Sequence, residues 1–160
     1  MKKFLTVANL AKCVAFICGV VAFCLMFADQ LAYTSGNTTT TMAFKDALFG
    51  GSIDLIFFKM TVHGAFLSFI GYVILAVAAL LTAANFFVTD KTANKFLPII
   101  NGALYITGGV FILLEATIFN SANDLKTILW GLAPAPIIAA VLAFVGGLLN
   151  ACSGFLPSKK

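Results

Sequence analysis

The sequence predicts an all-α membrane protein, an antiparallel bundle of four transmembrane helices with a structured outer segment between the first helix and the second. Hydrophobic residues make up 61% of the 160 residues and charged residues 10%, whereas soluble domains are roughly 45–50% apolar and about 25% charged. Four charge-free stretches are each long enough to cross a bilayer once their edges are included, because a span needs about 20 residues. We therefore expect a single membrane domain over residues 1–160.

The charge-free stretches place the four helices along the chain. They are expected over about 12–33, 61–88, 97–119 and 127–154. The connections after the second and third helices are short, so the helices that they join should be antiparallel neighbours. Pro98 is expected in the first turn of the third helix, where its missing N–H costs no hydrogen bond. Trp130 is expected at the outer membrane interface, where aromatic residues are enriched.

The ten lysines, in a chain without arginine, predict how the protein lies across the membrane. The side that holds the N-terminus carries Lys2, Lys3, Lys12, Lys91, Lys95, Lys159 and Lys160, and the other side carries Lys45, Lys59 and Lys126. The positive-inside rule then puts both termini in the cytoplasm and the chain in the plasma membrane. Lys12 either marks the inner boundary or reaches toward it from within the first helix. Membrane lipid is an expected partner, and nucleic acid is not.

The segment 34–60 is the longest connection and exceeds the roughly 12–15 residues above which a loop usually has structure or a function of its own. Residues 38–41 are all threonine, which is β-branched, so we expect a short strand or hairpin there. Gly50 and Gly51 precede Ser52, a suitable N-cap for an interfacial helix over residues 53–60. The alternative is a polar loop without regular structure.

Four polar side chains on the outer side are the candidate functional residues. Asp29 and Glu115 are the acids that cost most to place in lipid, and intramembrane acids are functional candidates by default. Lys59 and His63 lie near the expected start of the second helix. The four predict an outer polar pocket in which the acids pair with Lys59 or His63, or bind a cation. In the alternative interpretation, both acids sit hydrated at the headgroup boundary without a partner.

Small residues at four-residue spacing mark helix faces that permit close approach of two backbones. The candidate helix-packing residues are Ala15 and Gly19 in the first helix, Gly64 and Ser68 in the second, and Ala139, Ala143, Gly147 and Ala151 in the fourth. These faces pack either within one bundle or against another subunit. A weak echo between residues 80–83 and 148–151 is typical of tandem helical hairpins, and chance similarity of apolar segments explains it as well.

No catalytic residue, cofactor or metal site is predicted. Cys13, Cys18, Cys24 and Cys152 lie in or beside apolar runs and outside any C-x-x-C pair, which favours small packed hydrophobes over a disulfide framework. His63 is the only histidine, so the spacing of a zinc site is missing. The sequence also lacks a Gly-rich phosphate loop, a nucleophile elbow and a His-Glu metal motif, which disfavours an enzyme.

Three segments carry a resemblance to known membrane proteins. Met1-Lys2-Lys3 before a long helix, Ala47-Leu48-Phe49-Gly50-Gly51 after a Thr-rich strand, and Val145-Gly146-Gly147-Leu148-Leu149 in the last helix resemble small four-span proteins of low-GC Gram-positive bacteria. The resemblance is one of pattern over most of the chain and implies a bacterial multi-pass protein without an assigned activity. The order of spans is also similar to the claudin-type layout. The claudin Trp–Gly-Leu-Trp motif and the paired outer cysteines are absent from residues 34–60.

The sequence leaves three functional hypotheses. The leading one is a non-enzymatic tetraspan that acts through contacts, either as a homo-oligomer or as an accessory subunit of a membrane complex. The alternative is a small transporter or channel-like protein in which Asp29, His63 and Glu115 handle a cation or proton. A membrane enzyme of unknown type is the third.

Overall fold

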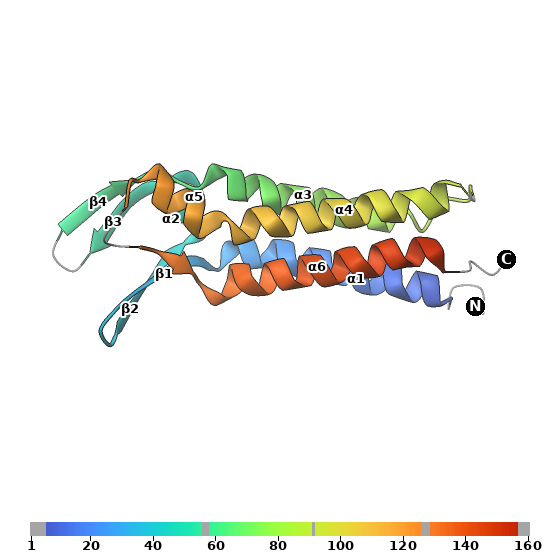
Figure 1. Cartoon of the computed structure of the whole chain (residues 1–160), viewed down its shortest axis with the longest axis horizontal. Coiled ribbons are helices and arrows are strands. Elements are labelled where there is room, and N and C mark those ends of the chain that lie inside the picture. The colour runs from blue at the N-terminus through green and yellow to red at the C-terminus, as the bar shows by residue number, and fades with distance from the viewer. Residues whose placement is uncertain (1–5, 56–57, 91, 126–128, 157–160) are drawn as a thin grey trace.

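Four long helices lie side by side and carry a small β-rich head at one end (Figure 1). The computed structural model describes residues 6–55, 58–90, 92–125 and 129–156. The long helices are α1 (Val7–Cys24), α3 (Phe66–Ala84), α4 (Ala93–Leu113) and α6 (Pro134–Phe155). All four are long and apolar enough to cross a membrane, which confirms the four apolar helices predicted from the sequence.

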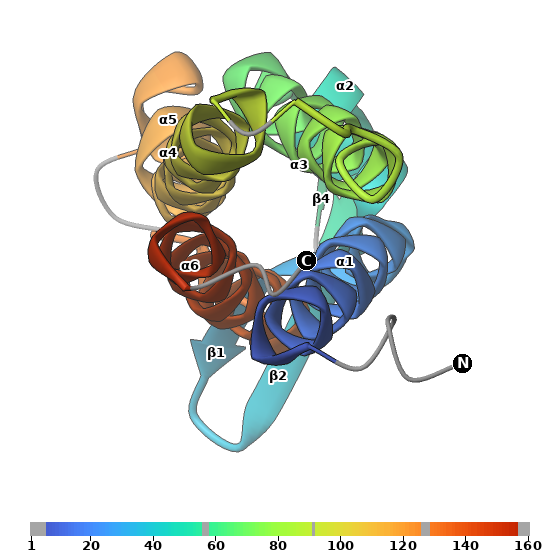
Figure 2. The same cartoon turned by 90° about the vertical axis from the view of Figure 1, so that its right-hand side faces the viewer.

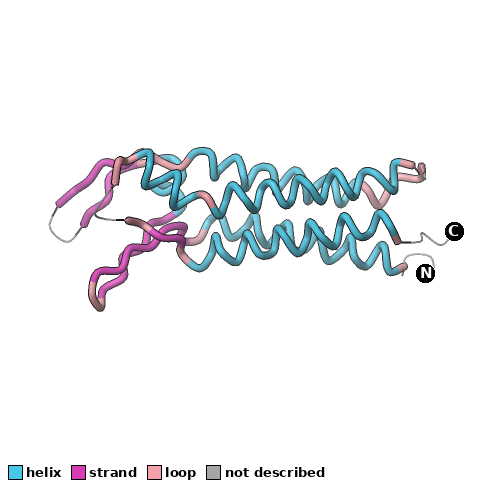
Figure 3. Tube along the Cα trace, in the orientation of Figure 1, coloured by secondary structure: helices cyan, strands magenta, loops and turns pink. Residues whose placement is uncertain are grey.

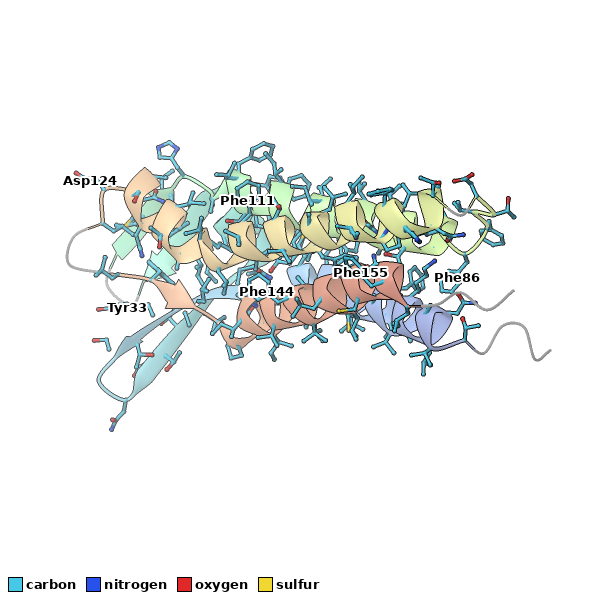
Figure 4. The ribbon with its side chains drawn as sticks, turned by 45° about the vertical axis from the view of Figure 1, so that its right-hand side comes forward. Tyr33, Phe86, Phe111, Asp124, Phe144 and Phe155 are labelled. Atoms are coloured by element: carbon cyan, nitrogen blue, oxygen red, sulfur yellow. The ribbon has the colours of Figure 1, made fainter. Side chains whose placement is uncertain are left out.

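The helices form a ring in the order α1, α3, α4, α6, so α3 and α6 face each other across the centre (Figure 2). Neighbours in the ring run in opposite directions. Large apolar side chains such as Leu80 and Phe155 point outward, where they are 68% and 78% exposed. The outer surface of the helices is accordingly covered by carbon (Figure 4), the surface that contact with lipid chains requires.

The first helix is shorter at its head end than the sequence predicts. It starts at Val7, where the side chain of Thr6 accepts a hydrogen bond from Asn9 N–H. It gives way to the 3-10 turn η1 (Leu25–Phe27), and strand β1 (Asp29–Ser35) follows. The Gln30 side-chain amide donates hydrogen bonds to three backbone carbonyls at this end, those of Leu25, Met26 and Ala28. These hydrogen bonds cap the head end of α1. The observed helix, Val7–Cys24, both begins and ends earlier than the predicted range 12–33, which is wrong at both ends.

The other helix boundaries differ in a similar way. α4 begins at Ala93, so Pro98 lies inside the helix and not in its first turn. The third helix is also interrupted at Leu114 and continues as α5 (Glu115–Ala122). α6 begins at Pro134, a position at which proline costs no hydrogen bond, and residues 126–128 of the predicted fourth span lie outside the described residues.

The head contains five short strands among its described residues (Figure 3). β1 and β2 (Thr38–Ala43) form an antiparallel hairpin, and β5 (Gly131–Leu132) pairs with the other side of β1, which gives the order β2-β1-β5. The predicted strand at residues 38–41 is therefore confirmed. Gly36, at φ +60°, occupies the hairpin turn between β1 and β2, a conformation that glycine adopts at little cost.

The predicted interfacial helix over residues 53–60 is wrong. A short helix, α2 (Phe44–Phe49), comes earlier, and β3 (Gly51–Leu55) and β4 (Phe58–Val62) form a second hairpin. Gly50, at φ +82°, ends α2 and turns the chain into β3. The segment from 51 to 62 is rich in β-branched and aromatic residues, which favour a strand over the helix that Ser52 would have capped.

The head has a hydrophobic core of its own, separate from the core of the bundle. The head core comprises Leu31, Met42, Ala47, Val62, Ala65, Phe119 and Trp130. Trp130 is 2% exposed and packs edge-on against the Phe119 ring, so its indole faces the interior of the head and not the lipid. The Tyr33 ring of β1 lies 5.9 Å from the indole and the Phe119 ring of α5 lies 6.3 Å from it, so Trp130 is enclosed between these two elements.

Two asparagines, Asn120 of α5 and Asn123 at its C-cap, hold the head together by binding backbone N–H and C=O groups as a neighbouring strand would. The Asn120 amide accepts a hydrogen bond from Trp130 N–H (3.0 Å) and donates one to its carbonyl (2.8 Å). Asn123 binds the N–H and carbonyl of His63 in the same way. The polar groups of these two connections are thereby satisfied without a further strand.

Replacing Asn120 by alanine is expected to destabilise the head by about 1–3 kcal/mol, because both polar groups of Trp130 lose their partner. Trp130 is the only tryptophan of the chain, so its fluorescence during thermal unfolding reports on the head directly. Asn37→Ala, at the exposed tip of the β1–β2 hairpin, is the control. Equal unfolding temperatures for the two variants would contradict the role given to Asn120.

Candidate functional site

The structure separates the four polar residues singled out from the sequence. Glu115, the first residue of α5, is 0% exposed. Asp29, at the start of β1, and Lys59, in β4, are exposed, as is His63, in the connection that leads to α3. Neither carboxylate oxygen of Glu115 has a hydrogen-bond partner, so this acid is not paired with Lys59 or His63. Glu115 alone is left as a buried candidate.

Glu115 lies at the junction between the two cores. Ile112, three residues earlier, belongs to the bundle core, and Phe119, four residues later, belongs to the head core. Tyr72 of α3 lies near Glu115, but its hydroxyl hydrogen is donated to Gln30 Oε1 at 2.7 Å. Tyr72 and Gln30 thus form the polar neighbourhood of the acid without satisfying it.

Ser68 is the residue of α3 that helix register places nearest the level of Glu115. Along these antiparallel helices, Leu75 contacts Gly108, and Gly71 contacts Phe111 and Ile112. One further turn in the same order brings Ser68 opposite Glu115. Ser68 is fully buried, and its hydroxyl oxygen also has no hydrogen-bond partner. Two buried polar side chains without a hydrogen-bond partner are therefore at a similar level of the junction, and they are not hydrogen-bonded to each other.

Burial raises the pKa of the Glu115 carboxyl to about 8. The cause is desolvation, because the charged carboxylate loses its hydration and gains no cation in return. Glu115 comes two residues after the end of the apolar span Ala93–Leu113, so it lies at the head end of the bundle. At neutral pH the carboxyl is therefore mostly a neutral acid.

A second group of polar side chains lies deep in the bundle. We call it the amide layer; its members are Thr82, Asn101, Tyr105 and Asn150, from α3, α4 and α6. The hydroxyl of Thr82 accepts hydrogen bonds from the amides of Asn101 (2.7 Å) and Asn150 (3.0 Å). The Tyr105 hydroxyl donates to the backbone carbonyl of Ala15 on α1 at 3.0 Å. The layer therefore joins all four long helices.

The sequence analysis did not single out the amide layer. Its signal was present, because Asn101 and Asn150 are uncharged polar residues inside long apolar runs, where a side-chain amide is costly unless it is hydrogen-bonded. Thr82 and Asn150 hold equivalent places in the echo between residues 80–83 and 148–151, and they bond across the centre of the ring. The layer ties the helices together and is distant from the junction.

The predicted helix-packing residues lie inside the chain. Ala15, Ser68, Ala139 and Ala143 are fully buried. A Cβ on Gly19 would clash with the Tyr105 ring, and one on Gly147 would lie 2.9 Å from the Gly102 carbonyl, beside which Ala151 also packs. Gly64 is an exception, because it precedes α3 and packs against the backbone of Leu48 and Gly50. These small residues are therefore used within one chain.

Lys12 reaches toward the end of the bundle away from the head. Its side chain is 5% exposed, and its ammonium donates to the Asn94 side chain, near the start of α4, at 3.2 Å. Of the two registers considered, the one in which Lys12 extends from within the first helix agrees with this contact.

The described residues also bear on other kinds of site. A surface hollow of about 390 Å³ lies on the head and is lined by Thr117, Asn120, Ser121, Asp124, Leu125 and Leu129. Within 6–55, 58–90, 92–125 and 129–156, no three metal-ligating side chains gather. Neither a protein-family model nor a curated protein matches this sequence.

Proposed function

We propose that this chain is a non-enzymatic, multi-pass membrane protein that acts through contacts of its head, and that its partner is a second copy bound along the edge of strand β2. The observation that carries the proposal is the position of β2. It is the last strand in the order β2-β1-β5, so one side of its backbone has no neighbour among the described strands.

The pairing of the hairpin identifies which groups lie on that side. Thr38 pairs with Ser35 across the turn, and Thr40 pairs with Tyr33. In a hairpin with a two-residue turn, these alternate pairs are the ones that exchange backbone hydrogen bonds. Thr39 and Thr41 then direct their N–H and C=O groups away from β1. The hydroxyls of Thr34 and Thr39 lie 3.1 Å apart, in agreement with the closer side chains of a non-hydrogen-bonded pair.

The chemistry of the edge favours a second strand of the same kind. Natural edge strands are usually protected by charged residues or proline. Residues 30–44 contain neither, and β2 begins with four successive threonines. Two copies of this strand would present the same neutral, β-branched surface, which fits a self-complementary contact with main-chain hydrogen bonds.

The rest of the molecule supports contact over transport. The junction and the amide layer are separated by fully buried apolar side chains of the bundle core, among them Leu75, Ala78 and Ile112. The small-residue faces already pack within the chain, which leaves the head as the free surface. The lysine distribution supports a head outside the plasma membrane with both termini in the cytoplasm.

Thr41→Pro tests the proposal because proline removes the outward N–H without removing a hydrogen bond to β1. In lipid nanodiscs or native-like particles, the wild-type chain is expected to associate, and Thr41→Pro to lower its association constant at least about tenfold, the effect of about 1.4 kcal/mol. Thr41→Val keeps the N–H and the β-branched shape, so it should associate as the wild type does. Equal association of all three proteins would overturn the proposal.

A further inference from the structure

The junction between the cores contains two buried polar side chains at matching positions. Ser68 comes three residues after Ala65 of the head core and four before Tyr72 of the bundle core. Glu115 comes three residues after Ile112 of the bundle core and four before Phe119 of the head core, so the two cores follow in the opposite order along the chain. Each polar side chain is therefore about one helical turn from either core.

The protonation state of Glu115 decides whether this arrangement can be satisfied. A neutral carboxylic acid has one hydrogen to donate, and the unpartnered hydroxyl oxygen of Ser68 is able to accept it. A carboxylate has no hydrogen to donate and several lone pairs to satisfy, more than one hydroxyl supplies. The ionised form would need water or a cation to enter the junction.

Among the described residues, the charged groups around the junction do not supply a counter-charge. α5 contacts α3, α4 and β5. The titratable residues on these elements are Tyr72 on α3 and Lys95 and Tyr105 on α4. His63, whose backbone is bound by Asn123 eight residues beyond Glu115, is exposed. Lys95 lies near the start of α4, roughly 30 Å from Glu115 at about 1.5 Å per residue. Tyr72 is already bonded to Gln30.

We propose that Glu115 is a proton-binding site that fastens the head to the bundle. Its neutral acid places no charge in the junction and lets α5 pack tightly on α3, and a change of side-chain rotamer would let it donate a hydrogen bond to Ser68. When the proton leaves to water, the carboxylate draws solvent into the junction and loosens the head. The site is independent of the β2 edge, since neither residue lies in the sheet.

The test is a pH titration of the wild-type protein in lipid nanodiscs, read by the infrared band of protonated carboxyl groups and by Trp130 fluorescence. The folded state holds this proton more tightly than the unfolded chain, so stability falls as pH rises from the ordinary glutamate range and levels off above the folded pKa. Both signals should change with a midpoint near pH 8. Thermal unfolding should occur at a higher temperature at pH 6 than at pH 9.

Three variants separate this proposal from its alternatives. Glu115→Gln keeps the shape without the titration, so its infrared and fluorescence signals should not change near pH 8. Asp29→Asn removes an exposed acid at the same end and should titrate as the wild type does. Ser68→Ala removes the acceptor of the neutral acid, so the midpoint of the pH titration should fall. A rise would mean that Ser68 donates its hydrogen to the carboxylate, and it would overturn the pairing.

Two outcomes would overturn the proton assignment itself. The first is that the pH titration of the infrared and fluorescence signals is the same in Glu115→Gln as in the wild type. The second is recovery of wild-type stability at pH 9 by added sodium or calcium, without recovery in Glu115→Gln, which would make the site one for a cation. Association through β2 is measured in a separate experiment, so the failure of one proposal can be told apart from the failure of the other.

Discussion

Replacing Gly147 by leucine is expected to prevent the native packing of α4 against α6. A Cβ at this position would lie 2.9 Å from the Gly102 carbonyl oxygen and 3.1 Å from side-chain carbons of Tyr105 and Ile106. The first of these atoms is backbone and cannot move aside as a flexible side chain can. Since leucine adds three further carbons, we expect a loss of more than about 4 kcal/mol, the range of severe core substitutions.

Val141→Leu is the matched control, because Val141 is 53% exposed on the outward face of the same helix. In detergent, gel filtration and thermal unfolding should show a folded, monodisperse control and an aggregated or strongly destabilised Gly147→Leu. A Gly147→Leu protein that elutes and unfolds as the wild type does would contradict the packing described for α4 and α6.

Replacing Thr82 by valine is expected to cost about 2–4 kcal/mol, although the two side chains have nearly the same shape. The hydroxyl oxygen accepts hydrogen bonds from Asn101 and Asn150, and the loss of a partner by a buried donor costs about 1–3 kcal/mol. Both amides lie where water does not reach them, since Asn101 is 3% and Asn150 0% exposed.

Thr107→Val is the control for this substitution. Thr107 lies on an exposed face of α4, so the same loss of a hydroxyl should change the unfolding temperature little. Thermal unfolding in one detergent or lipid composition compares the two directly. Equal unfolding temperatures would show that the amide layer does not stabilise the bundle.

The sequence predicted the features that depend on local composition. Long apolar runs gave four helices, and the four threonines after Asn37 gave the strand that became β2. Glu115 was singled out because an acid next to an apolar span is costly wherever it lies. Each of these inferences uses a property of neighbouring residues, which the sequence displays without reference to the fold.

The parts that escaped prediction depend on residues far apart in the chain. Thr82 and Asn150 are 68 positions apart, and only the ring of helices brings them together. The burial of Trp130 could not be predicted, because it requires Phe119 and β1, which are distant in sequence, to enclose the indole. The helix over residues 53–60 was wrongly predicted because Ser52 is locally a suitable N-cap. Pairing with β4, which the local sequence does not show, makes this segment a strand.

The most direct test of contact through the head is amide hydrogen exchange of β2 in the wild-type protein reconstituted in lipid. If a second copy binds along this edge, the outward N–H groups of Thr39 and Thr41 are hydrogen-bonded and should exchange as slowly as those of Thr38 and Thr40, which pair with β1. Fast exchange at Thr39 and Thr41 beside slow exchange at Thr38 and Thr40 would show a free edge and contradict the proposed function.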